Sequence, residues 1–168
     1  SCNIPKSDKK RVVIVGGGFG GLKLAQKLKR SNYQVVLLDK NNYHQFPPLI
    51  YQVASSGIEP SSIAFPFRRI FQRRKDFYFR LASVLSIMPE EKIIQTSIGK
   101  LSYDYLVLAA GTTTNFFGNK HIEEESIPMK NLSESMGLRN ALLDNFERAL
   151  TCASEKERQE LLNVVIVG

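Results

Sequence analysis

The amino-acid sequence predicts an α/β fold built on a parallel sheet. Residues Val12–Gly16 form a short run of branched apolar side chains, which is typical of a strand buried on both faces. A glycine-rich turn follows, then the amphipathic segment Leu22–Arg30 and a second buried-strand pattern at Gln34–Leu38. Strand, turn, helix and strand within residues 12–39 form a βαβ unit, so we expect a Rossmann-like domain of three layers.

The later elements are less regular but continue the same fold. We expect a loop at residues 41–48, a helix from Ser61–Ser62 through Phe71, and a long helix from Ser133. Phe77–Leu85 and Lys92–Ser97, separated by a turn, predict an antiparallel β excursion before the strand Tyr103–Ala109. Ser154 and Glu157 have the spacing of a capping box, which predicts a last short helix.

The five residues Val12–Gly16 recur at Val164–Gly168. Two buried strands can share such a sequence by coincidence, because Val and Ile runs are common. The alternative is a second βαβ unit that begins here and is cut off. We therefore expect a flexible leader at residues 1–10, a first domain at 11–162, and at 163–168 the first strand of a truncated second domain.

The composition excludes several classes of protein. The chain has 168 residues, 43% of them hydrophobic, which is too many for a disordered protein. It contains no apolar stretch long enough to span a membrane, and no basic–apolar–small segment opens it, so we expect no secretory signal. Cys2 and Cys152 lack the spacing of a metal site, so we expect no metal and a reducing, cytoplasmic location.

The glycine-rich turn fits the G-x-G-x-x-G pattern at Gly16, Gly18 and Gly21. The first glycine permits a tight turn, the second lets a pyrophosphate approach the backbone, and the third lets the helix pack on the sheet. The helix N-terminus then favours the phosphate charge. Asp39 ends the next strand, where a carboxylate accepts hydrogen bonds from an adenosine ribose. These residues predict a site for FAD or NAD rather than NADP.

Several segments resemble the N-terminal part of type II NADH dehydrogenases, flavoproteins of the pyridine nucleotide-disulfide oxidoreductase superfamily. The resemblance rests on the fingerprint with Asp39, on Asn42–Ala54, on Tyr103–Gly111 and on the repeated Val164–Gly168. It implies a FAD-containing NADH:quinone oxidoreductase in which a hydride passes from NADH to FAD and the electrons then pass to quinone. Ala110 and Pro47 depart from the family, which usually has Thr and Gln there.

The resemblance also implies roles for individual residues. The pyrophosphate of FAD would lie on the glycine-rich turn, the ribose would face Asp39 and Lys40, and adenine would meet the backbone of Val84. The remaining cofactor-binding residues would lie against FAD or its flavin ring, and the whole predicted set is Gly16, Gly18, Phe19, Gly20, Gly21, Asp39, Lys40, Pro48, Leu49, Val84, Ala110, Gly111 and Thr112. No side chain is expected to be an acid–base catalyst, and His44 and His121 are interpreted as structural.

The resemblance places the NAD site, the quinone site and the membrane anchor beyond residue 168. It implies that the full-length enzyme uses NADH and quinone and lies on the cytoplasmic face of the membrane, whereas this chain alone is expected to be inactive and to bind FAD weakly. Two alternatives stay open: another flavoprotein such as a sulfide:quinone reductase, or a non-catalytic module that binds nucleotides or nucleic acid. A basic cluster lies in the middle of the chain and consists of Arg68, Arg69, Arg73, Arg74 and Lys75. We interpret it first as a solvated helix face, second as a contact with anionic lipid, and third as a contact with nucleic acid.

Overall fold

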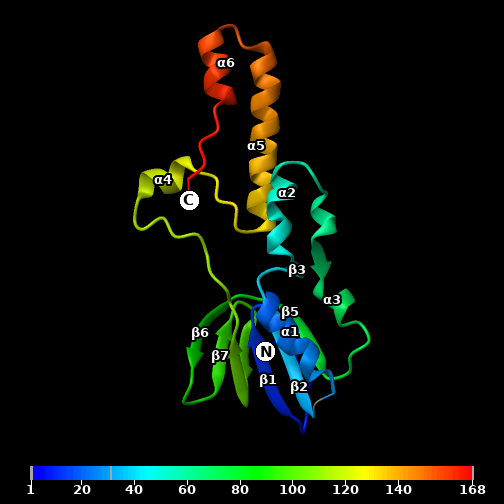
Figure 1. Ribbon diagram of the computed structural model, residues 1–168. Coiled ribbons are helices and arrows are strands. Elements are labelled where there is room, and N and C mark those ends of the chain that lie inside the picture. The colour runs from blue at the N-terminus through cyan, green and yellow to red at the C-terminus, as the bar shows by residue number, and fades with distance from the viewer. Residues whose placement is uncertain (1, 31, 168) are drawn as a thin grey trace. The chain divides into compact units, whose positions relative to one another are not determined.

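The chain forms two compact units, and the first is built on a four-stranded parallel sheet. The computed structural model describes residues 2–30 and 32–167. The first unit comprises the residues up to Gln45 together with 64–112. The sheet has the order β5-β2-β1-β9 (Figure 1). Its strands are β1 (Lys10–Val15), β2 (Tyr33–Asp39), β5 (Phe77–Leu81) and β9 (Tyr105–Leu108).

The strand order reverses beside β1. The chain moves from β1 through β2 to β5 on one side, and β9 then pairs with the other side of β1. Such a reversal opens a crevice at the carboxyl ends of the strands, where α/β proteins bind their ligands. The strand order alone therefore predicts a ligand site at this edge of the sheet.

Two layers cover the sheet, one on each face. Helix α1 (Phe19–Lys27) and the short helix η1 (Leu28–Arg30) lie on the face that carries Val12 and Ile14. A second, antiparallel sheet lies on the face of Val13 and Leu38, with strands β6 (Val84–Met88), β7 (Ile93–Thr96) and β8 (Gly99–Ser102). Alternate residues of β1 thus enter two separate cores, because successive strand side chains point to opposite faces. The three-layer prediction is confirmed.

A short antiparallel ribbon in the first unit lies against the glycine-rich turn. It consists of β3 (Tyr43–Gln45) and β4 (Ala64–Pro66), and the single-turn helix α3 (Phe67–Ile70) follows it. The predictions of a loop at 41–48 and of a helix from Ser61 were wrong here. Strand β3 forms by pairing with residues about twenty positions away, and Pro66 allows a helix to begin only after it.

The second unit comprises residues 46–63 and the chain from Thr113. Its helices are η2 (Pro47–Leu49), α2 (Ile50–Ala54), η3 (Pro60–Ser62), α4 (Lys120–Glu125), α5 (Leu132–Thr151) and α6 (Glu155–Leu162). Helix α2 packs against α5, and Ile50, Val53 and Leu132 are buried. Helix α5 begins with a capping box between Asn131 and Glu134, not at the predicted Ser133.

The prediction of a flexible leader at residues 1–10 needs correction for the described residues. Cys2 is buried in the core between the two sheets of the first unit, and Lys10 already belongs to β1. The Arg80 Nε donates to the Cys2 carbonyl oxygen at 2.8 Å, and the Gln34 Nε2 donates to that of Pro5 at 2.9 Å. Polar composition suggested a mobile segment, but these partners are distant in sequence and could not be read from it.

The predicted strand at residues 163–168 does not form within the described part, which ends at Val167. Residues 163–167 have no regular secondary structure, and Val164, Val165, Ile166 and Val167 are exposed. An apolar run becomes a strand only when a neighbouring strand pairs with it. Its assignment to a second nucleotide-binding domain stays a prediction. Across residues 2–30 and 32–167, no helix has both the length and the apolar character needed to cross a bilayer.

Candidate dinucleotide-binding site

The carboxyl edge of the parallel sheet gathers the predicted binding segments. The glycine-rich turn follows β1, Asp39 ends β2, and Ala109–Thr112 follows β9. The backbone joins these ends directly, because the Gly16 N–H donates to the Leu38 carbonyl and the Ala109 N–H donates to the Val15 carbonyl, both at 2.8 Å. Three segments that are far apart in sequence thus form one edge.

Two glycines of the G-x-G-x-x-G fingerprint are required by the protein itself. Gly16 has φ +99°, and a Cβ there would collide with the backbone of Ala109. A Cβ on Gly21 would collide with the Gly16 carbonyl, so this glycine lets α1 approach the end of β1. Gly16 thus permits the tight turn and Gly21 the close packing of helix on sheet, as the fingerprint predicts.

Gly18 is different, because nothing in the protein explains why it lacks a side chain. It has an ordinary φ of −64°, and a Cβ there would meet no atom within 4 Å. Gly18 is also the N-cap of α1, where no side chain caps the helix and no acidic residue lies in the first turn. The exposed backbone and the positive end of the helix dipole therefore leave room and charge for a phosphate. This fits the pyrophosphate of a dinucleotide.

Asp39 connects β2 to the glycine-rich turn. One carboxylate oxygen accepts the Gly17 N–H at 2.6 Å, and the other accepts the Asn41 N–H at 2.7 Å. Each oxygen keeps a second lone pair, so the half-buried carboxylate still has acceptor capacity for ribose hydroxyls. Burial, reinforced by the negative charge of Asp39, raises the pKa of the Tyr43 hydroxyl above its ordinary value of 10.0.

The other predicted residues of the first unit lie at or near the same edge. Lys40, Phe19, Ala110 and Thr112 are exposed, and Gly111 has φ +72° with open space beside it. Val84 begins β6, two residues after Ala82, whose N–H donates to the Asp39 carbonyl at 2.9 Å. Their contacts with a cofactor stay predictions.

Pro48 and Leu49 belong to the second unit, in the short helix η2. Pro48 is exposed and Leu49 is half-buried. Their predicted place beside a flavin ring also stays a prediction.

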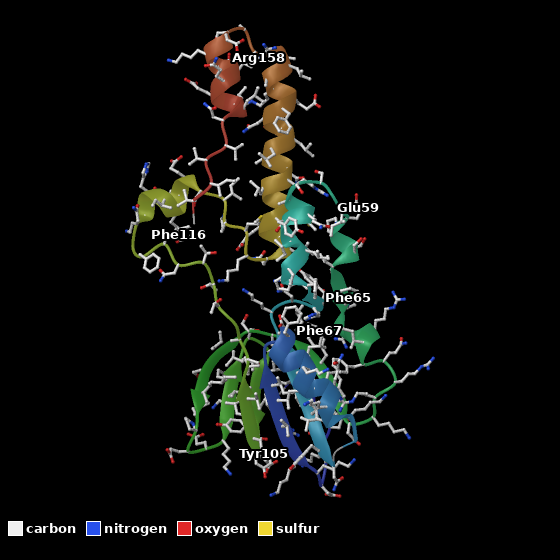
Figure 2. All side chains as sticks on the ribbon, viewed as in Figure 1. Glu59, Phe65, Phe67, Tyr105, Phe116 and Arg158 are labelled. Carbon is white, nitrogen blue, oxygen red and sulfur yellow. The ribbon has the colours of Figure 1, made fainter. Side chains whose placement is uncertain are left out.

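Three residues that the fingerprint did not single out support the turn from within. Gly17 is buried, and a Cβ there would collide with the ring of Phe67. His44 is buried as well, and its Nδ1 donates to the Gly17 carbonyl at 2.9 Å. Figure 2 shows Phe67 near the start of α1. The sequence offered one signal, since Gly17 stands between Gly16 and Gly18 at a position where the motif does not require a glycine.

The basic cluster at residues 68–75 does not form one helix face, because α3 ends at Ile70. Arg74 turns inward, where its guanidinium donates to the Ala25 and Leu28 carbonyls and lies over the Phe71 and Phe77 rings. It thereby caps the C-terminal end of α1, where a cation is favoured. Burial lowers the pKa of Arg74 from its ordinary value.

Two further members of the cluster, Arg69 and Arg73, line a groove of about 380 Å³ together with Gln26, Lys29 and Arg74. Arg69 and Arg73 are exposed there, and no carboxylate within the described ranges pairs with them or with Lys29. Arg74 therefore does not fit the interpretation as a solvated basic face, which stays a prediction for the other members of the cluster.

Residues 10–168 match the family model for pyridine nucleotide-disulphide oxidoreductases. The chain belongs to this family. The matched region includes every element of the candidate site.

The curated relatives are NADH or NAD(P)H quinone oxidoreductases. The chain is 35% identical over 162 residues to the type II NADH:quinone oxidoreductase Ndh of Mycobacterium tuberculosis, covering 94% of this chain and 35% of the relative. It is 34% identical to the mitochondrial external alternative NAD(P)H-ubiquinone oxidoreductase B1 of Solanum tuberosum, covering 99% of this chain and 31% of that protein. The chain thus spans about a third of the length of the relatives it matches.

Solved structures share the fold. NDH2 from Plasmodium falciparum in complex with NADH superposes with a TM-score of 0.83 at 24% identity, over 90% of this chain and 32% of that one. The sulfide:quinone oxidoreductase of Aquifex aeolicus gives 0.75 at 26% identity, over 82% of this chain and 32% of that one. Both are consistent with a Rossmann-like oxidoreductase domain.

Proposed function

We propose that this chain forms part of the FAD site of a type II NADH dehydrogenase, an enzyme that oxidises NADH and reduces quinone. The observation that carries the proposal is the open Gly18 at the uncapped start of α1, placed at the sheet edge beside Asp39. The two relatives named above as NADH or NAD(P)H quinone oxidoreductases support the same activity. Catalytic competence belongs to the whole protein, since the chain covers about a third of their length.

The residues of this chain bind and orient the cofactor. The N–H groups at the start of α1 would hold the pyrophosphate, and Asp39 would accept hydrogen bonds from the ribose. Ala110, Gly111 and Thr112, just past β9, would lie against the cofactor because small residues leave space at this edge. When bound, FAD supplies the capacity to accept a hydride and pass on its electrons.

The activity is tested with the protein expressed from its complete coding sequence. NADH oxidation is followed in the presence of a soluble quinone, and sulfide replaces NADH in a parallel assay. We expect quinone-dependent oxidation of NADH and none of sulfide. A protein that carries FAD but reduces quinone only with sulfide would overturn the proposed donor.

A sulfide:quinone reductase is the second candidate, and the Aquifex aeolicus structure favours it. That chemistry relies on reactive cysteines, whereas Cys2 is buried in the core of the first unit and Cys152 ends α5 in the second. Replacing both cysteines with serine should leave NADH:quinone activity within about twofold. A loss of quinone reduction in a variant that still folds and binds FAD would favour the second candidate.

We place the enzyme at the cytoplasmic face of a membrane as a peripheral protein, and the groove of Lys29, Arg69 and Arg73 supports this. Exposed cations without carboxylate partners are attracted to anionic lipid, at about 1 kcal/mol each near the surface. Vesicles with and without anionic lipid are sedimented with the wild type and with R69E/R73E. The control K100E/K130E makes the same charge change at exposed sites elsewhere.

We expect sedimentation with the anionic vesicles only, weakened selectively in R69E/R73E. If vesicle binding weakens equally in the two double variants, it depends on the net charge of the protein and not on the groove. Salt-dependent binding to DNA in place of vesicles would favour the nucleic-acid alternative.

A further inference from the structure

The underside of the glycine-rich turn is held by the β3–β4 ribbon. His44 lies in β3 and pairs with Phe65 of β4, and Phe67 follows at the start of α3. The Phe67 N–H donates to the Asn42 carbonyl at 3.1 Å, which ties the start of α3 back to the segment before β3. His44 and Phe67 therefore reach the turn from one locally connected support.

His44 makes a directed contact with the turn. Its Nδ1 donates to the Gly17 carbonyl oxygen at 2.9 Å, and because a carbonyl can only accept, Nδ1 carries the proton. The imidazole ring also meets the Phe19 ring edge-on, with the ring centroids 5.4 Å apart. His44 thus contacts the turn on both sides of Gly18, once through hydrogen bonding and once through packing.

Phe67 fixes the same turn from the core. Its side chain is fully buried, and the ring fills the space where a side chain on Gly17 would stand. The Gly17 N–H donates to Asp39 and the Gly17 carbonyl accepts from His44, so both polar backbone atoms of Gly17 are hydrogen-bonded while the Phe67 ring packs against its Cα. The conformation of Gly17 sets the direction of the Gly18 backbone, on which a phosphate would rest.

We propose that His44 and Phe67 are positioning residues that hold the glycine-rich turn in its phosphate-binding conformation. The inference rests on the proposed FAD site, and it gives His44 a role through the Gly17 carbonyl rather than in the chemistry. In a preorganised turn the cofactor does not have to order the backbone when it binds, so affinity is gained without a new contact. Loss of the His44 donor would leave a buried carbonyl unsatisfied and loosen the turn.

The test compares two substitutions of one side chain in the protein from its complete coding sequence. The Asn Nδ2 can stand where the His Nδ1 stands, so His44→Asn keeps the donor, whereas His44→Phe keeps the ring and removes the donor. We expect the FAD dissociation constant to rise about tenfold in His44→Phe and to stay within about threefold in His44→Asn. Ile94→Val, in the opposite core, is the control for a general loss of stability, and should lower Tm without changing FAD affinity.

A second readout separates this inference from the proposed function. Amide hydrogen exchange at Gly17 and Gly18, measured without cofactor, should be faster in His44→Phe than in His44→Asn. Equal FAD affinity and equal exchange in the two variants would overturn the positioning role. A wild type that binds no FAD would overturn the proposed function, and the exchange rates would still decide whether His44 holds the turn.

Discussion

The carboxylate of Asp39 accepts the backbone N–H of Gly17 at 2.6 Å, so the end of β2 is bonded directly to the turn that follows β1. This bond places the predicted ribose acceptor next to the predicted phosphate site. It also means that Asp39 acts in the protein before any cofactor binds. Changes at Asp39 should therefore alter stability and affinity together.

We predict that Asp39→Asn lowers FAD affinity by about tenfold and stability by about 1–2 kcal/mol. Asparagine has one acceptor oxygen, so either the Gly17 or the Asn41 N–H would face an NH₂ group. Urea unfolding and FAD titration measure the two effects. The control is Asp104→Asn, because the Asp104 carboxylate accepts the Arg11 N–H at the other end of β1; it should lower stability alone.

Gly17 and Gly18 are neighbours whose substitution should have opposite consequences. Gly17→Ala places a methyl group against the Phe67 ring and should destabilise the protein by about 1–3 kcal/mol. Gly18→Ala enters open space at an ordinary φ, and the poorer N-cap offsets the reduced freedom of the unfolded chain, so Tm should change only slightly while FAD affinity falls about tenfold. Thermal unfolding and FAD titration on both variants check this. Unchanged FAD affinity in Gly18→Ala would contradict a phosphate site there.

The N-terminus of α5 offers a test of helix capping. The Asn131 side chain accepts the Glu134 N–H at 3.0 Å, and the Glu134 carboxylate accepts the Asn131 N–H at 3.3 Å. Asn131→Ala should cost about 1 kcal/mol, measured by chemical denaturation. Ser133→Ala, at the exposed position that the sequence favoured as the helix start, should change stability by less than about 0.5 kcal/mol. A larger effect at Ser133 would mean that the helix begins there.

Arg74 should matter for stability more than any other cation of its cluster. Arg74→Ala removes the donors to the Ala25 and Leu28 carbonyls and the cation over two phenylalanine rings. We expect a loss of about 2 kcal/mol in unfolding free energy. Arg73→Ala, at an exposed position, should change it by less than about 0.5 kcal/mol. Similar values for the two variants would show that Arg74 is only part of a solvated surface.

Tyr43 should make the protein sensitive to alkaline pH. Its pKa is raised in the folded state, because burial and the Asp39 charge disfavour the phenolate. The folded protein therefore holds this proton more tightly than the unfolded chain does, so the stabilisation is present below pH 10.0 and is lost as the pH rises through the folded-state pKa. Unfolding free energies at pH 9 and 11 should fall more in the wild type than in Tyr43→Phe. A steeper fall in Tyr43→Phe would contradict the sign.

The sequence was most informative where structure depends on neighbours in the chain. The βαβ unit, the glycine-rich turn and Asp39 were all recognised from local patterns, and the structure places them at one sheet edge. Ser154 likewise caps α6 as its spacing with Glu157 predicted. In each case the residues that decide the conformation lie within a few positions, or follow a known spacing.

The sequence was least informative where distant residues meet. The burial of Cys2, the pairing of β3 with β4 and the inward turn of Arg74 all depend on partners tens of residues away. Composition marked these segments as a leader, a loop and a basic helix face. The support of the turn by His44 and Phe67 was missed for the same reason.

The central claim is that the carboxyl edge of the parallel sheet binds FAD. The most direct measurement is the flavin absorbance of the purified protein from its complete coding sequence, expressed as moles of flavin per mole of chain. The claim predicts about one FAD per chain in the wild type and a clear loss in Gly18→Ala, a variant that should remain folded. A folded wild-type protein without flavin, which also fails to take up added FAD, would contradict it.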